Sequence, residues 1–376
     1  MKAGPARATP RALAPLALAA ALAAALGSCG RGTVPLGLVG VLSGRQSELA
    51  IAGRNGVELR IEEANARGGL RGRRVELLAL DDGGTEAGFR EAVARIAARK
   101  ARIVVGPFLS SEGEFAAQSA EPLLFLSPTV SAARFSGRDD KLLRIMASNA
   151  AAAEAIGGFL GAKAAGKGAL VVRDETNAAY ADDYERLFAG AFEAAGGGKA
   201  RSLSVPGFGT ASFLDAARKI VERAPEAILV IAGGPDAAML FRQLSRLGYA
   251  GMRAVSGWTM TSDFTAQGVE ASEGVYFSHQ YDLGDQSPRF MAFKEAYLAR
   301  FGREASFSAL YGYEAADLAL DLLAAKPGAG SEELKAAALA WGPRRGLQDE
   351  WSFDRYGDAS RPARVYRLLE GRAVRQ

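Results

Sequence analysis

The fold is decided by the apolar run VPLGLVGVL at residues 34–42 and by the helical pattern after it. The run has the length of a buried strand, and residues 49–66 after it carry apolar side chains at helical spacing. A turn with three glycines over residues 65–72 then leads into a second strand at 75–80. Strand, helix and strand at this spacing predict a parallel βαβ unit.

The same alternation continues and then begins again further along the chain. Strands are predicted at 103–105, 169–172 and 227–231, with helices at 181–195 and after 234. Two such series indicate two lobes of similar build, each with a parallel sheet covered on both faces. Ligands of open parallel sheets bind beyond the carboxyl ends of the strands, so the loops after each strand are the candidate binding loops.

The first 28 residues have the features of a secretory signal. Lys2, Arg7 and Arg11 precede an apolar run at 12–26 that Pro15 interrupts and that is too short to span a membrane comfortably. We therefore predict a signal peptide over residues 1–28 and an extracytoplasmic protein.

The signal ends in Leu26-Gly27-Ser28-Cys29, which resembles a bacterial lipobox. In a lipobox the Cys thiol is acylated, and Cys29 is the single cysteine of the chain. Lipid on Cys29 would tether the protein to a membrane at the periplasmic face of the cell envelope. The alternative is an ordinary signal peptide in which this cysteine has no role.

Charge gives no support for a nucleic-acid partner. The leader holds three of the 46 basic residues and none of the 42 acidic ones, so its removal lowers the formal charge from +4 to +1. A near-neutral chain lacks the electrostatic footprint of a nucleic-acid-binding protein. The clusters Arg71-Gly72-Arg73-Arg74 and Arg344-Arg345 are interpreted as solvated loop charges.

Residue content argues against an enzyme. With Cys29 lipidated no thiol remains, and His279 is the single histidine, so neither a zinc site nor a cofactor is predicted. Gly207-Phe208-Gly209 lacks the third glycine of a dinucleotide loop. Adjacent acids such as Asp81-Asp82 would point to opposite faces of a strand, so they make a poor acid–base pair.

A succession of short motifs resembles a known family. The motifs are Val39-Gly40-Val41-Leu42-Ser43-Gly44, Asn55-Gly56, residues 65–72, Asp81-Asp82, Val105-Gly106-Pro107, Ser110-Ser111, Ser127-Pro128 and the stretch 346–357. Their order resembles the branched-chain amino-acid-binding family, the type I periplasmic binding proteins of ABC importers. The resemblance implies an α/β fold of two Rossmann-like lobes joined by a three-strand hinge, with the ligand cleft between them. It places lobe one at 34–148 plus 278–340 and lobe two at 149–277 plus 341–376.

The resemblance also implies binding residues on lobe one. Family members hold the ligand carboxylate with hydroxyls and backbone NH groups after two strands, and Ser110 and Ser131 fall at those positions. Phe108 and Thr129 are expected in the same pocket. Either serine could instead cap the following helix.

Lobe two is expected to close over the ligand with Tyr180 and Trp258, which could instead be a loop tyrosine and a core tryptophan. This chain departs from the amino-acid binders in three places, one of which is the loop 232–236, where their aromatic residue is missing. Leu49 stands where relatives carry an aromatic residue, and no acid falls at the position that holds an α-ammonium group. Asp236 is taken as a site residue, and Asp174 or Asp263 could equally replace the missing acid, so the resemblance leaves open an amino acid, another carboxylate, an amide or an aromatic metabolite.

The sequence thus predicts a solute-binding lipoprotein that delivers a small polar ligand to an ABC permease. The alternative within the same fold is a ligand sensor or envelope regulator that reports to a kinase or another protein partner. A Rossmann-type enzyme is the third interpretation and has the least support.

Overall fold

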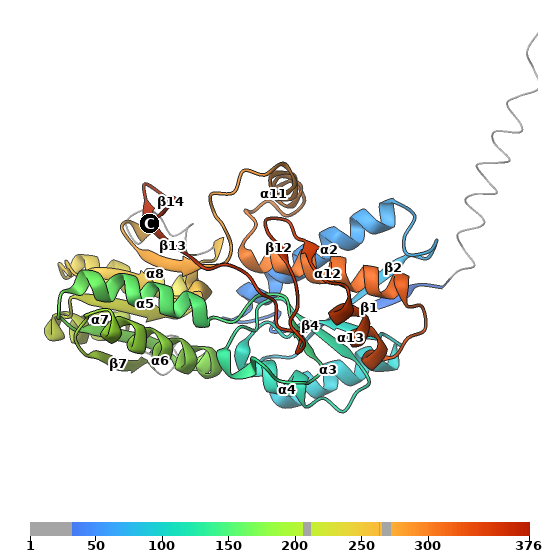
Figure 1. Ribbon diagram of the computed structural model, residues 1–376, viewed down its shortest axis with the longest axis horizontal. Helices are drawn as coiled ribbons and strands as arrows, with labels where there is room; N and C mark the ends of the chain where they lie inside the picture. Colours follow the sequence, from blue (N-terminus) through green and yellow to red (C-terminus); the bar gives the residue numbers. More distant parts are fainter. Residues whose placement is uncertain (1–31, 206–211, 263, 265–271) are drawn as a thin grey trace, which may run out of the picture.

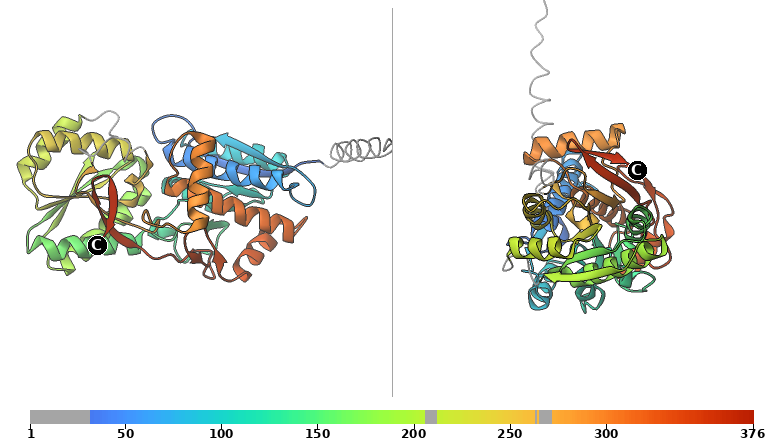
Figure 2. Two further views of the ribbon diagram at one scale, coloured as in Figure 1. Left: turned by 90° about the horizontal axis from the view of Figure 1, so that it is seen from above. Right: turned by 90° about the vertical axis from the view of Figure 1, so that its left-hand side faces the viewer.

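The computed structural model describes residues 32–205, 212–262, 264 and 272–376, and it places them in two lobes along one long axis (Figure 1). Each lobe is a sheet with helices on both faces, as the view from above shows (Figure 2). The predicted α/β architecture is therefore present. Residues 1–28 and Cys29, which carry the predicted signal and lipid site, lie outside the described residues.

Lobe one contains a parallel sheet in the order β2-β1-β3-β4-β5. Its strands are β1 (Val34–Gly40), β2 (Val75–Asp81), β3 (Ile103–Val105), β4 (Leu124–Ser127) and β5 (Leu142–Arg144). One face packs against α2 (Glu48–Ala66), α12 (Phe307–Ala325) and α13 (Ser331–Ala340), and the other packs against α3 (Glu86–Ala98) and α4 (Gly113–Ala117). Neighbouring β1 residues Leu38 and Val39 enter these opposite cores, as strand geometry requires.

Lobe two contains a sheet in the order β14-β13-β10-β9-β8-β6-β7. Its strands are β6 (Ala169–Asp174), β7 (Ala200–Val205), β8 (Ala227–Ile231), β9 (Met252–Val255), β10 (Tyr276–His279), β13 (Arg364–Leu369) and β14 (Arg372–Arg375). The first five are parallel, whereas β13 and β14 are antiparallel. Helices α5 (Ala150–Ala164) and α6 (Ala178–Ala194) cover one face, and α7 (Phe213–Arg223) and α8 (Gly234–Arg246) cover the other.

Two glycine contacts bring α2 and α12 unusually close together. A Cβ atom on Gly56 would lie 2.0 Å from the Ala309 carbonyl oxygen, and one on Gly312 would lie 2.2 Å from the Gly53 carbonyl oxygen. Because only glycine fits at these positions, the two helices approach backbone to backbone. Helix α11 (Pro288–Phe301) lies against the same α2.

Three segments cross between the lobes, after β5, after β10 and before β13. The Gln280 side chain joins the first two, because its Oε1 accepts from Ala147 N at 3.0 Å and its Nε2 donates to the Ser148 carbonyl at 2.9 Å. The third is held by Arg361, whose Nε donates to the Ile145 carbonyl at 2.9 Å. These hydrogen bonds hold the crossing segments together as one hinge.

The C-terminal part of the chain, predicted to belong to lobe two, contacts both lobes. Only β13 and β14 join the second sheet, whereas β11 (Arg344–Arg345) and β12 (Glu350–Trp351) form a separate hairpin. Leu347 N donates to Glu314 of α12 at 2.6 Å, and Ala359 N donates to the Arg144 carbonyl of β5 at 3.1 Å. We therefore propose that residues 344–361 belong with lobe one, and the other boundaries remain predictions.

Candidate ligand-binding site

Seven of the eight predicted ligand-binding residues surround one cavity between the lobes, here called the inner cavity. They are Leu49, Phe108, Ser110, Thr129 and Ser131 from lobe one, with Tyr180 and Trp258 from lobe two. Met146, Asn177 and Phe307 complete the lining. Its volume of about 10 Å³ holds roughly one water molecule. This volume is too small for a metabolite in the arrangement of the lobes that the structure describes.

The Ser110 hydroxyl connects the two binding loops of lobe one. Ser110 begins a short 3-10 helix after β3, and its Oγ accepts from Ser131 N and Ala132 N, both at 3.2 Å. Because two backbone NH groups occupy its lone pairs, its own O–H hydrogen remains to donate. The Ser131 Oγ makes no hydrogen bond with any residue the structure describes. Both serines can therefore donate to an acceptor in the inner cavity.

Thr129 has a different role from the two serines. Its Oγ1 donates to the Phe108 carbonyl at 2.6 Å, so its hydrogen is already used. Ser127 makes a similar link, because its Oγ donates to the Pro107 carbonyl at 2.7 Å and accepts from Val130 N at 3.0 Å. These two hydroxyls fix the loop after β4 against the loop after β3.

Phe108 forms an apolar wall of the cavity and is almost completely buried. Its ring lies against two glycines: a Cβ on Gly53 would come within 2.1 Å of the ring, and one on Gly40 within 2.7 Å. The absence of side chains at Gly40 on β1 and Gly53 on α2 therefore allows this position of the ring.

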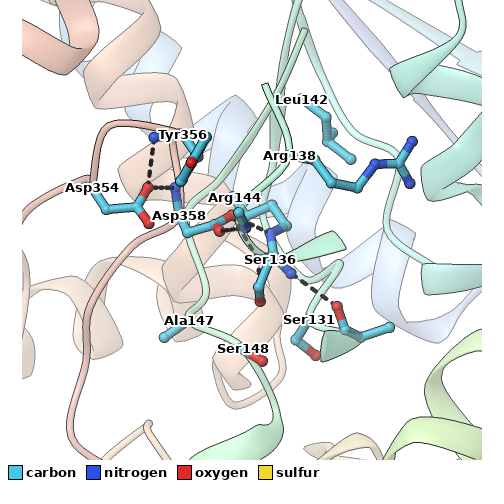
Figure 3. A network of polar contacts seen from close by, with 12 residues as sticks. Ser131, Ser136, Arg138, Leu142, Arg144, Ala147, Ser148, Asp354, Tyr356 and Asp358 are labelled. Carbon is cyan, nitrogen blue, oxygen red and sulfur yellow. Dashed lines mark hydrogen bonds and ion pairs between the residues drawn. The ribbon is translucent and has the colours of Figure 1, made fainter. Parts of the chain in front are cut away.

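The Ser131 loop is held in place by the buried Arg144 (Figure 3). Its Nη1 donates to the Ala132 carbonyl at 3.0 Å and its Nη2 donates to Ser136 Oγ at 2.9 Å. Its Nε donates to Asp358 Oδ1 at 2.7 Å, which brings the third crossing segment to the same point. Arg144 thus couples the binding loop to the hinge.

Lobe two presents Tyr180 and Trp258 as a pair. Tyr180 is the third residue of α6 and is buried, so it is not an exposed loop tyrosine. Its Oη accepts from Trp258 N at 3.3 Å, and the two rings meet edge to face at 6.1 Å between centroids. Burial raises the pKa of Tyr180, so its hydroxyl stays protonated.

The eighth predicted residue, Asp236, lies at a second cavity of about 360 Å³, here called the outer cavity. The outer cavity shares Leu49 and Trp258 with the inner one, so the two adjoin. Asp236 forms an ion pair with Arg45 of lobe one across the cavity. Burial raises the pKa of Asp236, and the Arg45 charge opposes that shift.

Two further contacts join the lobes beside the inner cavity. Arg134 of lobe one pairs with Asp183 of α6, with Nε and Oδ2 3.2 Å apart. Ser111 N donates to Asn177 Oδ1 at 3.1 Å. The sequence analysis did not single out Arg45, Arg134 or Asn177 as site residues. Asn177 and Arg45 had a signal, because they lie in the loops after β6 and β1, whereas nothing local in the sequence marks the pairing of Arg134 with Asp183.

Charge and metal ligands are absent from the inner cavity as far as the structure describes it. None of the described residues that line it carries a charged side chain. Within the described ranges, no group of three or more His, Cys, Asp and Glu side chains is placed to hold a metal ion. Asp263, the remaining candidate for the missing acid, lies outside the described residues.

Among the described helices none has the length and apolar character needed to cross a membrane.

Sequence comparison identifies the family of this two-lobed binding site. Residues 33–372 match the profile of the family described as periplasmic binding protein. The chain belongs to the periplasmic binding protein family. No curated protein matches its sequence. The family resemblance predicted from the motifs is thus confirmed over nearly the whole chain.

Solved structures of this family share the fold at low sequence identity. The substrate-binding protein LivJ of Streptococcus pneumoniae, in complex with isoleucine, is 21% identical with a TM-score of 0.79, and the match covers 92% of this chain and 100% of that one. A solute-binding protein of Rhodopseudomonas palustris, in complex with 3,4-dihydroxybenzoic acid, is 19% identical with a TM-score of 0.80, covering 92% and 96%. The leucine-binding protein LivK of Thermotoga maritima is 21% identical with a TM-score of 0.77, covering 92% and 98%.

Proposed function

We propose that this periplasmic binding protein is the solute-binding lipoprotein of an ABC importer and that it closes its lobes on a small carboxylate with an apolar body. The observation that carries the ligand class is the pair Ser110 and Ser131, whose O–H hydrogens are available in a cavity walled by Phe108, Phe307 and Trp258. Hydroxyl donors suit a carboxylate, and aromatic walls suit an apolar or aromatic body.

The cavity favours a carboxylate that has no ammonium group. An α-amino acid would bring a positive charge into a site whose described lining residues are all uncharged. Burying a charge without a partner is costly, and Asp236, the acid of lobe two taken as a site residue, is already paired with Arg45. Relatives of the same fold include the isoleucine complex of LivJ and the 3,4-dihydroxybenzoic acid complex from Rhodopseudomonas palustris. The second ligand type fits this cavity better.

Binding is proposed to proceed by closure of the two lobes. The crossing segments at Ala147, Gln280 and Arg361 supply the hinge, and the contacts of Arg45, Arg134 and Asn177 hold the lobes together. Ligand that contacts both lobes stabilises the closed arrangement, and a permease reads that arrangement.

A thermal-shift screen of residues 30–376 tests the ligand class. Matched pairs are compared, such as benzoate with benzamide and phenylpropanoate with phenylalanine. A ligand that binds only the folded protein at 100 times its dissociation constant adds about 2.7 kcal/mol to stability. We expect stabilisation by acids without an ammonium group. Hits confined to amino acids would refute this ligand class, and the absence of any hit would refute solute binding.

The lipid anchor is tested separately with Cys29→Ala. We expect the wild-type chain to be acylated and to partition with membranes, because Cys29 ends the lipobox-like stretch. The variant should lose the acyl mass in mass spectrometry. Acylation that persists in the variant, or a wild-type chain without it, would contradict the anchor.

A further inference from the structure

A group of cations gathers at the end of lobe one where the described chain begins. Arg73 and Arg74 precede β2, whereas Arg99, Lys100 and Arg102 follow α3, so two separate loops meet there. The sequence analysis noted only the loop that contains Arg73 and Arg74, and it interpreted the charges of that loop as solvated. The structure adds the second loop beside it, and we call these five residues the anchor-end surface. It lies at the end of the long axis remote from lobe two (Figure 1).

Most of this positive charge has no carboxylate partner. Arg99 pairs with Glu76 at 3.0 Å. Among the described residues, no carboxylate lies within 4 Å of the charged groups of the other four. Arg102 donates to the carbonyls of Lys326 and Ala329 at 3.1 and 3.0 Å, which orients its guanidinium without neutralising it. The surface therefore keeps a local positive potential on a chain that is almost neutral without its leader.

The cations surround a hollow of about 380 Å³, which is wide enough for a phosphodiester headgroup. Arg73, Arg99, Lys100 and Arg102 line it together with Thr33 and Glu76. The hollow adjoins the start of the chain directly. Arg73 donates from Nε to the Gly32 carbonyl at 2.9 Å and from Nη2 to the Thr33 carbonyl at 2.5 Å.

The position of the proposed lipid fixes the direction in which this surface faces. Cys29 precedes Gly32 by three residues, and three extended residues reach at most about 10 Å. Acyl chains on Cys29 therefore hold the anchor-end surface within roughly one Debye length of the bilayer. At that distance cations attract anionic headgroups strongly, and a lipid chain combined with basic residues gives stable membrane attachment.

We propose that the anchor-end surface binds the anionic phospholipid headgroups of the membrane that holds the lipid anchor. The orientation argument rests on the proposed acylation of Cys29, whereas the charge and the hollow do not. With the lipid and the anchor-end surface both bound, the protein contacts the membrane through the end of lobe one that is remote from lobe two. The cleft then lies away from the bilayer, because it is built at the opposite edge of the same sheet.

Vesicle binding by the chain from Gly30 onward, without lipid, tests the proposal. This chain contains every described element. It should co-sediment with vesicles of phosphatidylglycerol and phosphatidylcholine in equal parts, bind far less to phosphatidylcholine alone, and dissociate as salt is raised. Each cation near such a surface contributes about fivefold to partitioning, so Arg73→Gln/Arg74→Gln/Lys100→Gln should lower it by roughly 100-fold.

The matched control removes three cations from the far pole of lobe two. Lys167, Lys199 and Arg201 line another hollow there, and Lys167→Gln/Lys199→Gln/Arg201→Gln changes the net charge by the same amount. It should leave vesicle binding nearly unchanged. Equal losses in both variants would show a net-charge effect and overturn the proposal, as would absence of binding to anionic vesicles at low salt. Retained binding by the anchor-end variant would overturn it also. Acylation and solute binding are measured on their own, so their failure does not affect this result.

Discussion

Among single residues, the hydroxyls of the inner cavity have distinct roles that their residue types do not reveal. Ser131 Oγ has no hydrogen-bond partner among the described residues, whereas Ser110 Oγ accepts from two backbone NH groups. We expect Ser131→Ala to raise the dissociation constant for a carboxylate ligand about tenfold or more, since a hydrogen bond to a charged group contributes about 1.5–3 kcal/mol. The melting temperature of the Ser131→Ala protein should equal that of the wild type, whereas Ser110→Ala should lower both the melting temperature and the affinity. Calorimetric titration with thermal melting measures both, and equal behaviour of the two variants would contradict these roles.

Glu112, two residues after Ser110, should make stability depend on pH. Burial raises the pKa of Glu112 to about 8, and the neighbouring Asp82 carboxylate adds to the shift. The folded protein therefore keeps a proton that the unfolded chain loses above pH 4.5, so stability falls as pH rises from there through about 8. The slope reaches about 1.4 kcal/mol per pH unit for one proton. Burial also raises the pKa of Asp82, to about 6, so Glu112→Gln should remove the part of this fall above about pH 6 and leave the part below it in melting curves.

The neighbouring Glu114 supplies a control with the opposite sign. Its hydrogen bond with Arg138 lowers the pKa of this half-buried carboxyl, so its contribution to stability is present above its ordinary pKa and is lost on acidification. Glu114→Gln should leave the alkaline fall intact. If the Glu112→Gln protein still lost stability between pH 5 and 8 as the wild type does, the buried pair would not be its cause.

At the level of elements, the contact between α2 and α12 depends on glycines. Gly56→Ala places a Cβ 2.0 Å from the Ala309 carbonyl oxygen, so the helices must separate. Overpacking of this kind costs about 1–3 kcal/mol. The separation also moves Leu49 and Phe307, which line the inner cavity from these two helices, so affinity should fall with stability. Gly158→Ala in α5 is the control, because no atom lies within 4 Å of its added Cβ. Similar denaturation midpoints for the two variants would contradict the packing argument.

The elements and the loops of the site could be predicted because their signals are local. Apolar runs gave β1, β3 and β8, and the loops after strands gave Ser110 and Ser131 by resemblance. Contacts between distant segments could not be predicted in this way. Arg144 meets Asp358 across 214 positions, and Leu347 donates to a Glu314 that nothing nearby in sequence distinguishes. Such pairs form only because the folded chain brings distant segments together, and no local pattern in the sequence indicates them.

Across the whole molecule, the ion pairs between the lobes should set the closure equilibrium. Arg45 and Asp236 belong to different lobes, so their pair exists only when the outer cavity is closed. Arg45→Met keeps the apolar stem but removes this contact, which for a half-exposed guanidinium contributes up to about 1 kcal/mol. Because ligand binds across both lobes, the lost closed-state stability should weaken binding up to about fivefold and increase the radius of gyration in X-ray scattering.

Lys167→Met tests whether that effect comes from closure and not from charge. Lys167 pairs with Glu226 at 2.8 Å, and both residues lie within lobe two, so this variant loses an ion pair and one positive charge without touching the cleft. Its dissociation constant and radius of gyration should match the wild type. High salt should reduce the difference in dissociation constant between wild type and Arg45→Met, because screening weakens the partly exposed pair of Arg45 with Asp236 that only the wild type has. Identical scattering and affinity for wild type and Arg45→Met would show that the pair of Arg45 with Asp236 does not control how far the lobes open.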